Sequence, residues 1–280
     1  ANASAPAANN PWLNAAATHP FNVGNDMNHE SAATKQLVSR VVKHWLTNYK
    51  IDGFRWDLSK GFTQTNNPNN VGAWGNYDAS RIAIWKRIYD KMQAIEPNSY
   101  CILEHFADNT EEKELADYGT LLWGNANYNF NQATMGFTTD ASFNNAFANG
   151  RGWNQQHLVT YMESHDEERM MYKNLTFGNA TNPNHNAKNA YVALGRMQTA
   201  AVIFLTQPGP RMMWQFQELG YDISIENPCR VCNKPILWNY FTQARRRQLY
   251  DVYSATLKLR NDYETFRSLN FTYNLSGAVK

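Results

Sequence analysis

Residues 49–60 read YKIDGFRWDLSK, an apolar segment that carries an arginine and an aspartate two positions apart near its end. Alternate side chains of a strand face the same way, so Arg55 and Asp57 share one face while Phe54 and Trp56 share the other. We therefore expect Arg55 to lie beside Asp57 and to keep it ionised. An anionic Asp57 at the end of a strand can attack an electrophile. The alternative interpretation is that Arg55 and Asp57 form a purely structural ion pair.

Helical and strand patterns alternate along the rest of the chain. Apolar residues recur at helical spacing over residues 31–48, with Asn28 or Ser31 as the predicted N-cap. Further helices are predicted over residues 80–95, 111–118, 187–205 and 243–263, and further strands over 100–105, 120–123, 158–162 and 211–215. This alternation predicts an α/β fold of parallel βα units, in which functional residues gather where strands end.

Two more of the predicted strands end in carboxylates. Glu104 follows Cys-Ile-Leu, and we expect it to keep a proton near neutrality because this position is partly desolvated. The strand over 158–162 leads into Glu-Ser-His-Asp, which ends in Asp166. Cleavage of a glycosidic bond requires one anionic carboxylate and one protonated acid, which fits Asp57 and Glu104. Asp166 is then placed to stabilise positive charge on the sugar ring.

Several short stretches resemble the α-amylase family of glycoside hydrolases, glycoside hydrolase family thirteen. GFRWDLSK, ILEH and MESHD are similar to three of the family's motifs and occur in the family's order. GPRMMWQFQELGYD resembles its eighth-strand segment, so that the resemblance covers most of the chain. It implies a (β/α)8 TIM barrel and the hydrolysis of α-glucans with retention of configuration.

The resemblance also implies roles for individual residues, carried over position by position. The implied catalytic residues are Asp57 as nucleophile, Glu104 as general acid/base and Asp166 as transition-state stabiliser. The implied substrate-binding residues are Arg55 beside the nucleophile, His165 in the cleavage subsite and Lys60 on the leaving-group side. Glu163, Glu167 and Glu168 flank Asp166 and are interpreted as surface charge without a role.

Aromatic residues near these motifs are candidates for stacking on sugar rings. We expect this of Trp74 and Tyr77, because they lie in a polar loop after the nucleophile strand. The alternative for any single aromatic residue is core packing or loop anchoring. This alternative applies equally to Trp56, Trp123 and Tyr128.

The family's first motif, Asp-x-x-x-Asn-His on the third barrel strand, is absent. The nearest text, NDMNH at residues 25–29, has a different spacing and precedes a helix. The five predicted strands therefore correspond to the fourth to eighth strands of the barrel. We expect residues 1–265 to form a partial catalytic barrel and residues 266–280 to begin a truncated C-terminal β domain. Because open sheet edges are a liability, we expect the missing half upstream or from another chain.

Composition excludes several classes of protein. The 280 residues are 43% hydrophobic, and 26 basic against 24 acidic residues give a net charge of +2. We expect no nucleic-acid partner, since the triplet at residues 245–247 fits a solvated helix face. No apolar run reaches about 18 residues, which predicts no transmembrane segment. The N-terminal residues lack a signal-peptide pattern, so the protein is cytosolic or its signal was removed; we expect a secreted or periplasmic protein.

The three cysteines are too few for a disulfide framework. Cys229 and Cys232 have CxxC spacing without a second pair, which favours an incidental surface pair or a local disulfide over zinc. The family commonly holds a structural calcium between the barrel and an inserted domain. The resemblance thus implies calcium in the complete protein, with ligands mostly outside this chain. We predict no metal site within these residues.

These observations predict a retaining endo-hydrolase of α-1,4-glucosidic bonds in starch or maltooligosaccharides, acting through a covalent glycosyl-enzyme. Three alternatives stay open. The same carboxylates serve transglycosylases and debranching enzymes of the family. The absent first motif fits an amylase-like glucan-binding or inactive subunit. Finally, an α/β protein can carry strand-end carboxylates that are purely structural.

Overall fold

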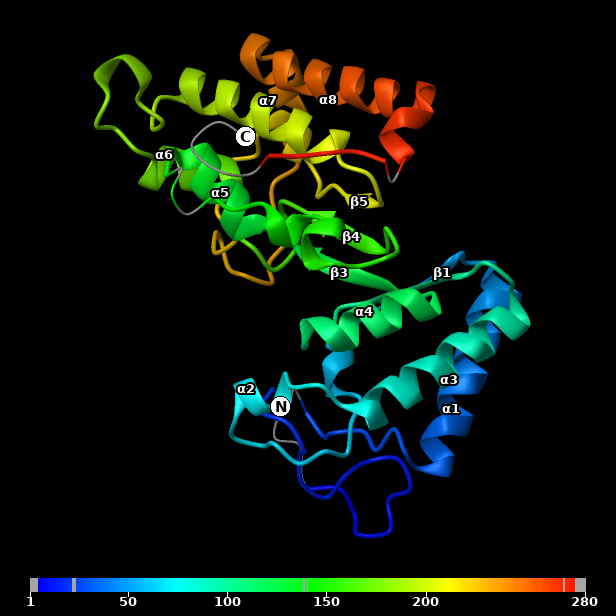
Figure 1. The fold of residues 1–280 in the computed structure, drawn as a ribbon. Coiled ribbons are helices and arrows are strands. Elements are labelled where there is room, and N and C mark those ends of the chain that lie inside the picture. The colour runs from blue at the N-terminus through cyan, green and yellow to red at the C-terminus, as the bar shows by residue number, and fades with distance from the viewer. Residues whose placement is uncertain (1–4, 22–23, 138, 140, 269, 275–280) are drawn as a thin grey trace. The chain divides into compact units, whose positions relative to one another are not determined.

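A computed structural model describes residues 5–21, 24–137, 139, 141–268 and 270–274 (Figure 1). Its strands are β1 (Gly53–Trp56), β2 (Tyr100–Leu103), β3 (Leu121–Asn125), β4 (Leu158–Tyr161) and β5 (Arg211–Met212). Its helices are α1 (Ala32–His44), α2 (Val71–Trp74), α3 (Ala79–Ile95), α4 (Asn109–Tyr118), α5 (Asn127–Met135), α6 (Met170–Phe177), α7 (Ala190–Thr206) and α8 (Ala244–Asp262). None of these described helices is long and apolar enough to cross a membrane.

The strands form one sheet in the order β1-β2-β3-β4-β5. Strands β1 and β2, β2 and β3, and β4 and β5 pair in parallel, with Trp56 opposite Leu103 in the first pair. Parallel strands that follow one another in chain order, with helices between them, are the arrangement of a (β/α)8 barrel. The predicted fold class is thus confirmed, with five strands of an incomplete barrel among the described residues.

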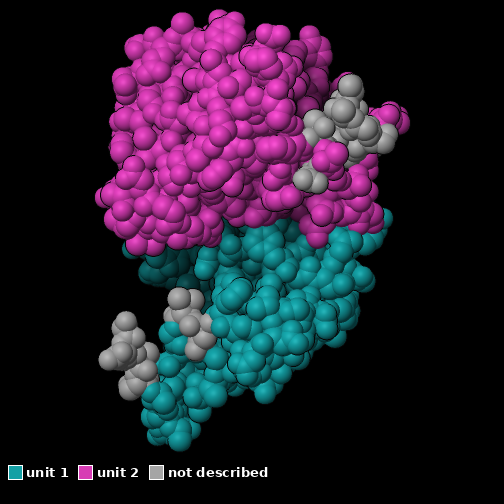
Figure 2. Space-filling view, turned by 90° about the vertical axis from the view of Figure 1, so that its left-hand side faces the viewer, with its two compact units in different colours: residues 1–123, 153–157 teal, residues 124–152, 158–280 magenta. Residues whose placement is uncertain are grey.

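The chain divides into two compact units, coloured separately in Figure 2. The first contains residues 1–123 and 153–157, and the second contains residues 124–152 and 158–280. In the first unit α1 packs against α3, and Val42 of α1 and Ile88 and Met92 of α3 are buried. The second unit has a core between α5, α7 and α8, where Phe130, Phe204, Leu249 and other side chains are fully buried. Figure 1 shows α7 and α8 side by side.

The first helix begins where the sequence predicts, although its cap differs in detail. Ser31 occupies the N-cap position, but its hydroxyl donates to the carbonyl of Pro11 instead of capping the helix. Asn28 accepts the N–H of Ser31 through its side-chain oxygen at 3.0 Å. The helix continues into a π-helical turn, Trp45–Tyr49. It stops at Lys50, whose left-handed backbone (φ 55°) turns the chain into β1.

One prediction near the C-terminus is corrected by the structure, and a second stays untested. Arg246 does not belong to a solvated helix face, because it is buried, donates to the carbonyl of Leu219 and pairs with Asp222 at 2.7 Å. Residues 270–274 form no strand, and the ring of Tyr273 instead stacks on that of Phe147. The C-terminal β domain over 266–280 stays a prediction, since residues 269 and 275–280 lie outside the described part of the chain.

Candidate active site

Three of the predicted site residues meet at the ends of β1 and β2. The guanidinium of Arg55 pairs with Asp57 through Nη1, as the sequence predicts. It also pairs with Glu104, with 2.9 Å between Nη2 and Oε1. The second oxygen of Glu104 accepts the N–H of Leu58 at 2.8 Å. The side chain of Asp57 is 76% exposed and that of Glu104 only 13%, so the site holds one open and one largely covered carboxyl group.

The backbone explains why these two carboxyl groups are neighbours. The N–H of Glu104 donates to the carbonyl of Trp56 at 3.0 Å, and the N–H of Ser59 returns a bond to the carbonyl of Glu104 at 2.9 Å. At the other end of β1 the strands approach so closely that a Cβ on Gly53 would lie 2.1 Å from the carbonyl oxygen of Tyr100. Only glycine fits such an approach, so this residue fixes the pairing of β1 with β2.

The contacts of Glu104 bear on one expectation. The sequence predicts a protonated Glu104, because apolar residues precede it. The structure gives it an arginine partner and a backbone N–H donor, contacts that its two carboxyl oxygens accept. The protonation state of Glu104 stays a prediction.

A buried polar network that sequence reasoning missed supports these strand ends. Glu111 pairs with Arg81 at 2.6 Å and with Nε2 of His105 at 2.7 Å. The Nδ1 atom of His105 lies 2.8 Å from the hydroxyl of Ser59, and Arg81 donates to the carbonyl of Lys60 at 3.1 Å. The network thereby links the turn after β1 to α3 and α4. The only signal in the sequence was an acidic residue in the first turn of α4, which resembles ordinary helix-end charge.

Arg81→Met is expected to destabilise the protein by about 3–5 kcal/mol, because it leaves the buried carboxylate of Glu111 without its cation. Burial alone raises the pKa of Glu111, but hydrogen bonds from His105 and Arg81 outweigh burial and lower this pKa below its ordinary value of 4.5. The stabilisation is therefore present above pH 4.5 and lost as the pH falls through the lower folded pKa. Urea unfolding of both proteins at neutral and acidic pH measures this difference.

Lys86→Met is the matched control for that experiment. Lys86 lies on the same helix and pairs with Glu114 at 2.7 Å, but both side chains are partly exposed. Exposed pairs contribute roughly 0–1 kcal/mol. Equal losses of stability in the two variants would contradict a special role for the buried network.

Lys60, predicted on the leaving-group side, is anchored within the first unit. Its ammonium donates to the carbonyl of Phe106 at 3.1 Å and lies 4.4 Å from the ring centre of Trp74. Burial, followed by the nearby charge of Arg81, lowers the pKa of Lys60. The leaving-group role of Lys60 stays a prediction.

The two candidate stacking residues, Trp74 and Tyr77, differ in their exposure to solvent. Trp74 is only 1% exposed, stacks on His19 and donates through Nε1 to the carbonyl of Lys60 at 3.1 Å. The prediction that Trp74 stacks on a sugar is wrong, because its ring anchors the loop. Tyr77 is 48% exposed, and its hydroxyl donates to Glu114 at 2.8 Å. Its ring stays accessible, so sugar stacking by Tyr77 stays a prediction.

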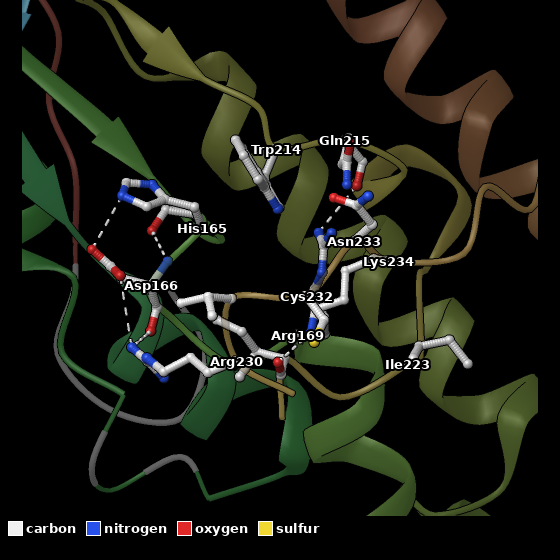
Figure 3. A pocket seen from close by; sticks show the side chains of 13 residues that line it. His165, Asp166, Arg169, Trp214, Gln215, Ile223, Arg230, Cys232, Asn233 and Lys234 are labelled. Carbon is white, nitrogen blue, oxygen red and sulfur yellow. Dashed lines mark hydrogen bonds and ion pairs between the residues drawn. The ribbon is translucent and has the colours of Figure 1, made fainter. Parts of the chain in front are cut away.

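The remaining predicted site residues, His165 and Asp166, lie in the second unit after β4. Nε2 of His165 is 3.2 Å from one carboxylate oxygen of Asp166, and the N–H of Asp166 donates to the hydroxyl of Ser164 at 3.0 Å. Both side chains line a cavity of about 410 Å³ together with Trp214 and Arg230 (Figure 3). The structure thus joins His165 to Asp166 and, separately, Arg55 to Asp57 and Glu104. That the two groups act on one sugar stays a prediction.

Two neighbouring glutamates are not the surface charge that the sequence suggests. Glu163 is fully buried, pairs with Arg169 at 2.9 Å and accepts the N–H of Met170 at 2.7 Å. Burial raises the pKa of Glu163. Glu168 accepts hydrogen bonds from the hydroxyl of Ser224 at 2.6 Å and from the N–H of Ile225 at 2.9 Å. Both residues therefore hold the segment that carries Asp166 in place.

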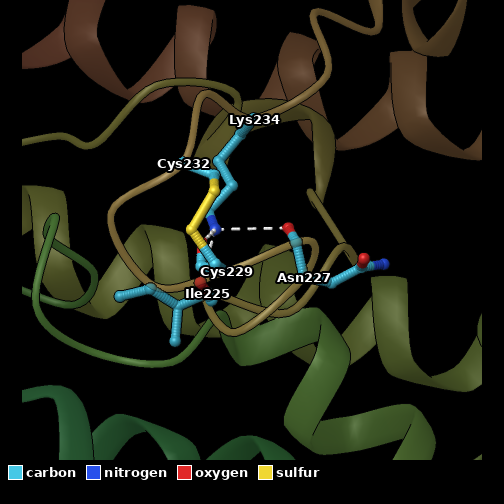
Figure 4. The surroundings of a disulfide bond; sticks show 5 residues. All are labelled: Ile225, Asn227, Cys229, Cys232 and Lys234. Atoms are coloured by element: carbon cyan, nitrogen blue, oxygen red, sulfur yellow. Dashed lines mark hydrogen bonds between the residues drawn. A yellow bond between two sulfur atoms is a disulfide. The ribbon is translucent and has the colours of Figure 1, made fainter.

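The CxxC pair forms a local disulfide, Cys229–Cys232, one of the two predicted alternatives (Figure 4). Within the described part of the chain, no three His, Cys, Asp or Glu side chains are grouped to hold a metal ion. Asp26 is the acidic residue of the NDMNH stretch. Its carboxylate oxygens instead contact the side chains of His19 and Asn14 and the N–H of Thr18. These donors do not fit a calcium ion, and no step of the proposed chemistry depends on one.

Comparison with known proteins gives a consistent result. A family model described as alpha amylase, catalytic domain, matches residues 11–246. Alpha-amylase 3 of Dictyoglomus thermophilum is 24% identical over 218 residues, which cover 76% of this chain and 38% of that protein. The chain therefore spans well under half the length of this curated relative.

Solved structures of similar fold include amylases and debranching enzymes. Eubacterium rectale Amy13B matches with a TM-score of 0.63 and 13% identity over 88% of this chain and 50% of that one. The debranching enzyme of Nostoc punctiforme matches with a TM-score of 0.55 and 17% identity, over 87% of this chain and 46% of that one. The pullulanase of Paenibacillus barengoltzii was solved in complex with maltohexaose and alpha-cyclodextrin. It matches with a TM-score of 0.58 and 16% identity, over 87% of this chain and 38% of that one. At these identities the likeness shows the fold.

Proposed function

This chain belongs to the family of alpha-amylase catalytic domains, and from that premise we propose that it serves in a retaining endo-hydrolase of α-1,4-glucosidic bonds in starch-like glucans. The observation that carries the proposal is the pairing of one guanidinium, that of Arg55, with both Asp57 and Glu104. Two carboxyl groups on adjacent nitrogens of one arginine lie close together. Retaining glycosidases hold their two carboxyl groups roughly 5–5.5 Å apart, because one carboxylate attacks the sugar directly, and a shared arginine supports an arrangement of this kind.

In the proposed reaction Asp57 attacks the anomeric carbon while the glycosidic C–O bond breaks. Glu104 gives its proton to the leaving oxygen, and a covalent glycosyl-enzyme forms. Water then attacks the same carbon, Glu104 takes a proton from that water, and Asp57 leaves as a carboxylate. In this proposal Asp166 stabilises the positive charge that develops on the sugar ring, and His165 binds the sugar in the cleavage subsite.

The contacts of Glu104 add a condition to this scheme. Arg55 and the N–H of Leu58 occupy both carboxyl oxygens of Glu104 in the free protein, so Glu104 has to leave one of these contacts before it can reach a leaving oxygen. We propose that a bound glucan draws Glu104 away from these partners, since catalytic contacts often form only in the substrate complex. Lys60 then contacts the glucan on the leaving-group side, and the exposed ring of Tyr77 stacks on a sugar.

We further propose that the remaining strands of a closed barrel come from sequence outside these 280 residues, upstream or on another chain. Five strands and coverage of half a solved amylase-family structure support this. We also propose a secreted or periplasmic location. The local disulfide Cys229–Cys232 supports it, because disulfides persist in oxidising compartments.

A debranching activity is the second candidate, because a debranching enzyme and a pullulanase are among the solved structures of similar fold. Product analysis separates the candidates. An endo-hydrolase shortens linear maltooligosaccharides, a debranching enzyme releases linear chains from pullulan, and a transglycosylase also yields products longer than the substrate.

The deciding test is the release of reducing sugar from soluble starch by this chain, tested alone and joined to the first three strands of the barrel. We expect activity in the joined form, with the α-anomer as first product by NMR. Activity in the chain alone would contradict the need for further strands. Glucan binding without turnover in both forms would overturn the hydrolase proposal in favour of a binding subunit.

A further inference from the structure

The loop after β5 is held in place by bonds between its own residues. The disulfide Cys229–Cys232 closes a short ring of chain around Arg230 and Val231 (Figure 4). The ammonium of Lys234 donates to the carbonyls of Asn227 at 3.2 Å and Cys229 at 2.6 Å, and also to that of Ile225. We call residues 224–234 the disulfide loop. Its backbone is thus held by a covalent link and by one cation.

The disulfide loop is also tied to the segment that carries Asp166. Glu168, two residues beyond Asp166, accepts the hydroxyl of Ser224 and the N–H of Ile225. The exposed tip of the loop adds no core, since Val231 is 94% exposed. Hydrophobic burial therefore does not explain why the tip is held so firmly in place.

The residue that the tip presents is Arg230, and it contacts Asp166. Its Nη2 donates to the backbone carbonyl of Asp166 at 2.7 Å and lies 3.7 Å from a carboxylate oxygen of the same residue (Figure 3). Its Nη1 pairs with Glu226 at 3.1 Å, which holds the guanidinium on its own loop. Asp166 is thus bound at its N–H by Ser164, at its carboxylate by His165 and at its carbonyl by Arg230.

We propose that Arg230 is a positioning residue, which sets Asp166 for the glycosidic reaction from a loop that the disulfide closes. The inference rests on the proposed function. A guanidinium is always charged and presents a rigid fork of donors, so it can hold a carbonyl and face a carboxylate together. Both side chains of this pair are about half exposed, and exposed pairs contribute little to stability. Arg230 therefore acts on turnover and not on folding.

The test is made in the chain joined to its remaining barrel strands, with soluble starch as substrate. Arg230→Gln is expected to lower kcat about 10–100-fold, the scale for residues that orient a reacting group, with KM changed less than about twofold. Arg230→Lys, which keeps the charge and a donor, is expected to recover part of kcat. Arg247→Gln removes an arginine of similar exposure that pairs with Asp251, and it should leave kcat unchanged.

A double-mutant cycle distinguishes positioning from a general structural effect. In an Asp166→Asn background, Arg230→Gln should lower kcat little further, because Arg230 acts on the reaction by positioning Asp166. A full 10–100-fold loss in that background would overturn the proposal, as would unchanged kcat in Arg230→Gln itself. Wild-type protein without starch hydrolysis would instead overturn the proposed function, and the inference with it.

Two further variants keep the test decisive. If Arg230→Gln unfolds, as its Tm would reveal, a wild-type kcat in a folded Arg230→Lys variant would count against the need for the guanidinium fork. Cys229→Ser combined with Cys232→Ser opens the loop while retaining Arg230. We expect a smaller loss of kcat in this variant, and an unchanged kcat would overturn the role of the disulfide.

Discussion

Asp57→Asn is expected to lower kcat for starch hydrolysis roughly 10⁴-fold or more, the scale seen when a covalent nucleophile is removed. The amide has nearly the shape of the carboxylate but cannot attack the anomeric carbon. Asp57 is largely exposed and pairs with Arg55, so its substitution should change stability by less than about 1 kcal/mol. The variant should therefore be folded and inactive.

Steady-state kinetics on soluble starch, together with Tm, measure both parts of this prediction. Asp251→Asn is the matched control, because Asp251 is also an exposed aspartate paired with an arginine. It should retain wild-type kcat. If Asp57→Asn keeps more than a few per cent of wild-type turnover, another group is the nucleophile and the assignment built on Arg55 fails.

Glu104→Gln is expected to reduce kcat on starch about 10²–10⁴-fold, the usual contribution of a general acid or base. Glutamine retains an oxygen that can accept the N–H of Leu58, but its amide protons are not acidic enough to be transferred to a leaving oxygen. The loss should depend on the leaving group. With a dinitrophenyl maltoside, whose leaving oxygen needs no proton, bond cleavage should survive while hydrolysis of the glycosyl-enzyme stays slow.

A burst of dinitrophenol in stopped-flow measurements is the expected signature of this variant. Glu96→Gln alters an exposed glutamate and serves as the control, with normal kinetics on both substrates. Equal loss on starch and on the dinitrophenyl substrate would show that Glu104 does not protonate the leaving oxygen. Its pairing with Arg55 would then be structural.

Much of the fold and part of the site could be predicted from the sequence. Short apolar runs between turn residues located all five strands. Strand alternation also placed Arg55 beside Asp57, whereas the pairing of Arg55 with Glu104 was not predicted. These successes share a cause, because strand period and strand order follow from local pattern.

The failures share a cause as well, because burial depends on partners far away in the chain. Trp74 ends the short helix α2 within a polar stretch of sequence, and it is hidden from solvent by His19, Phe21 and Lys60, which are far away in the chain. Glu163 precedes Asp166 by three residues and looks equally polar, yet Arg169 and the start of α6 enclose it. The disulfide loop could be recognised as a cysteine pair, but its contact with Asp166 spans 64 residues.

The ammonium of Lys234 holds its loop in the way that a bound cation would. Its ammonium gathers three backbone oxygens around one positive centre, much as a bound sodium or potassium ion does in other loops. This cation is attached to the chain, so its local concentration does not vary with the medium. Chelators and dialysis cannot remove it. Chemistry that neutralises amines, such as acetylation or carbamylation, would instead release the loop that carries Arg230.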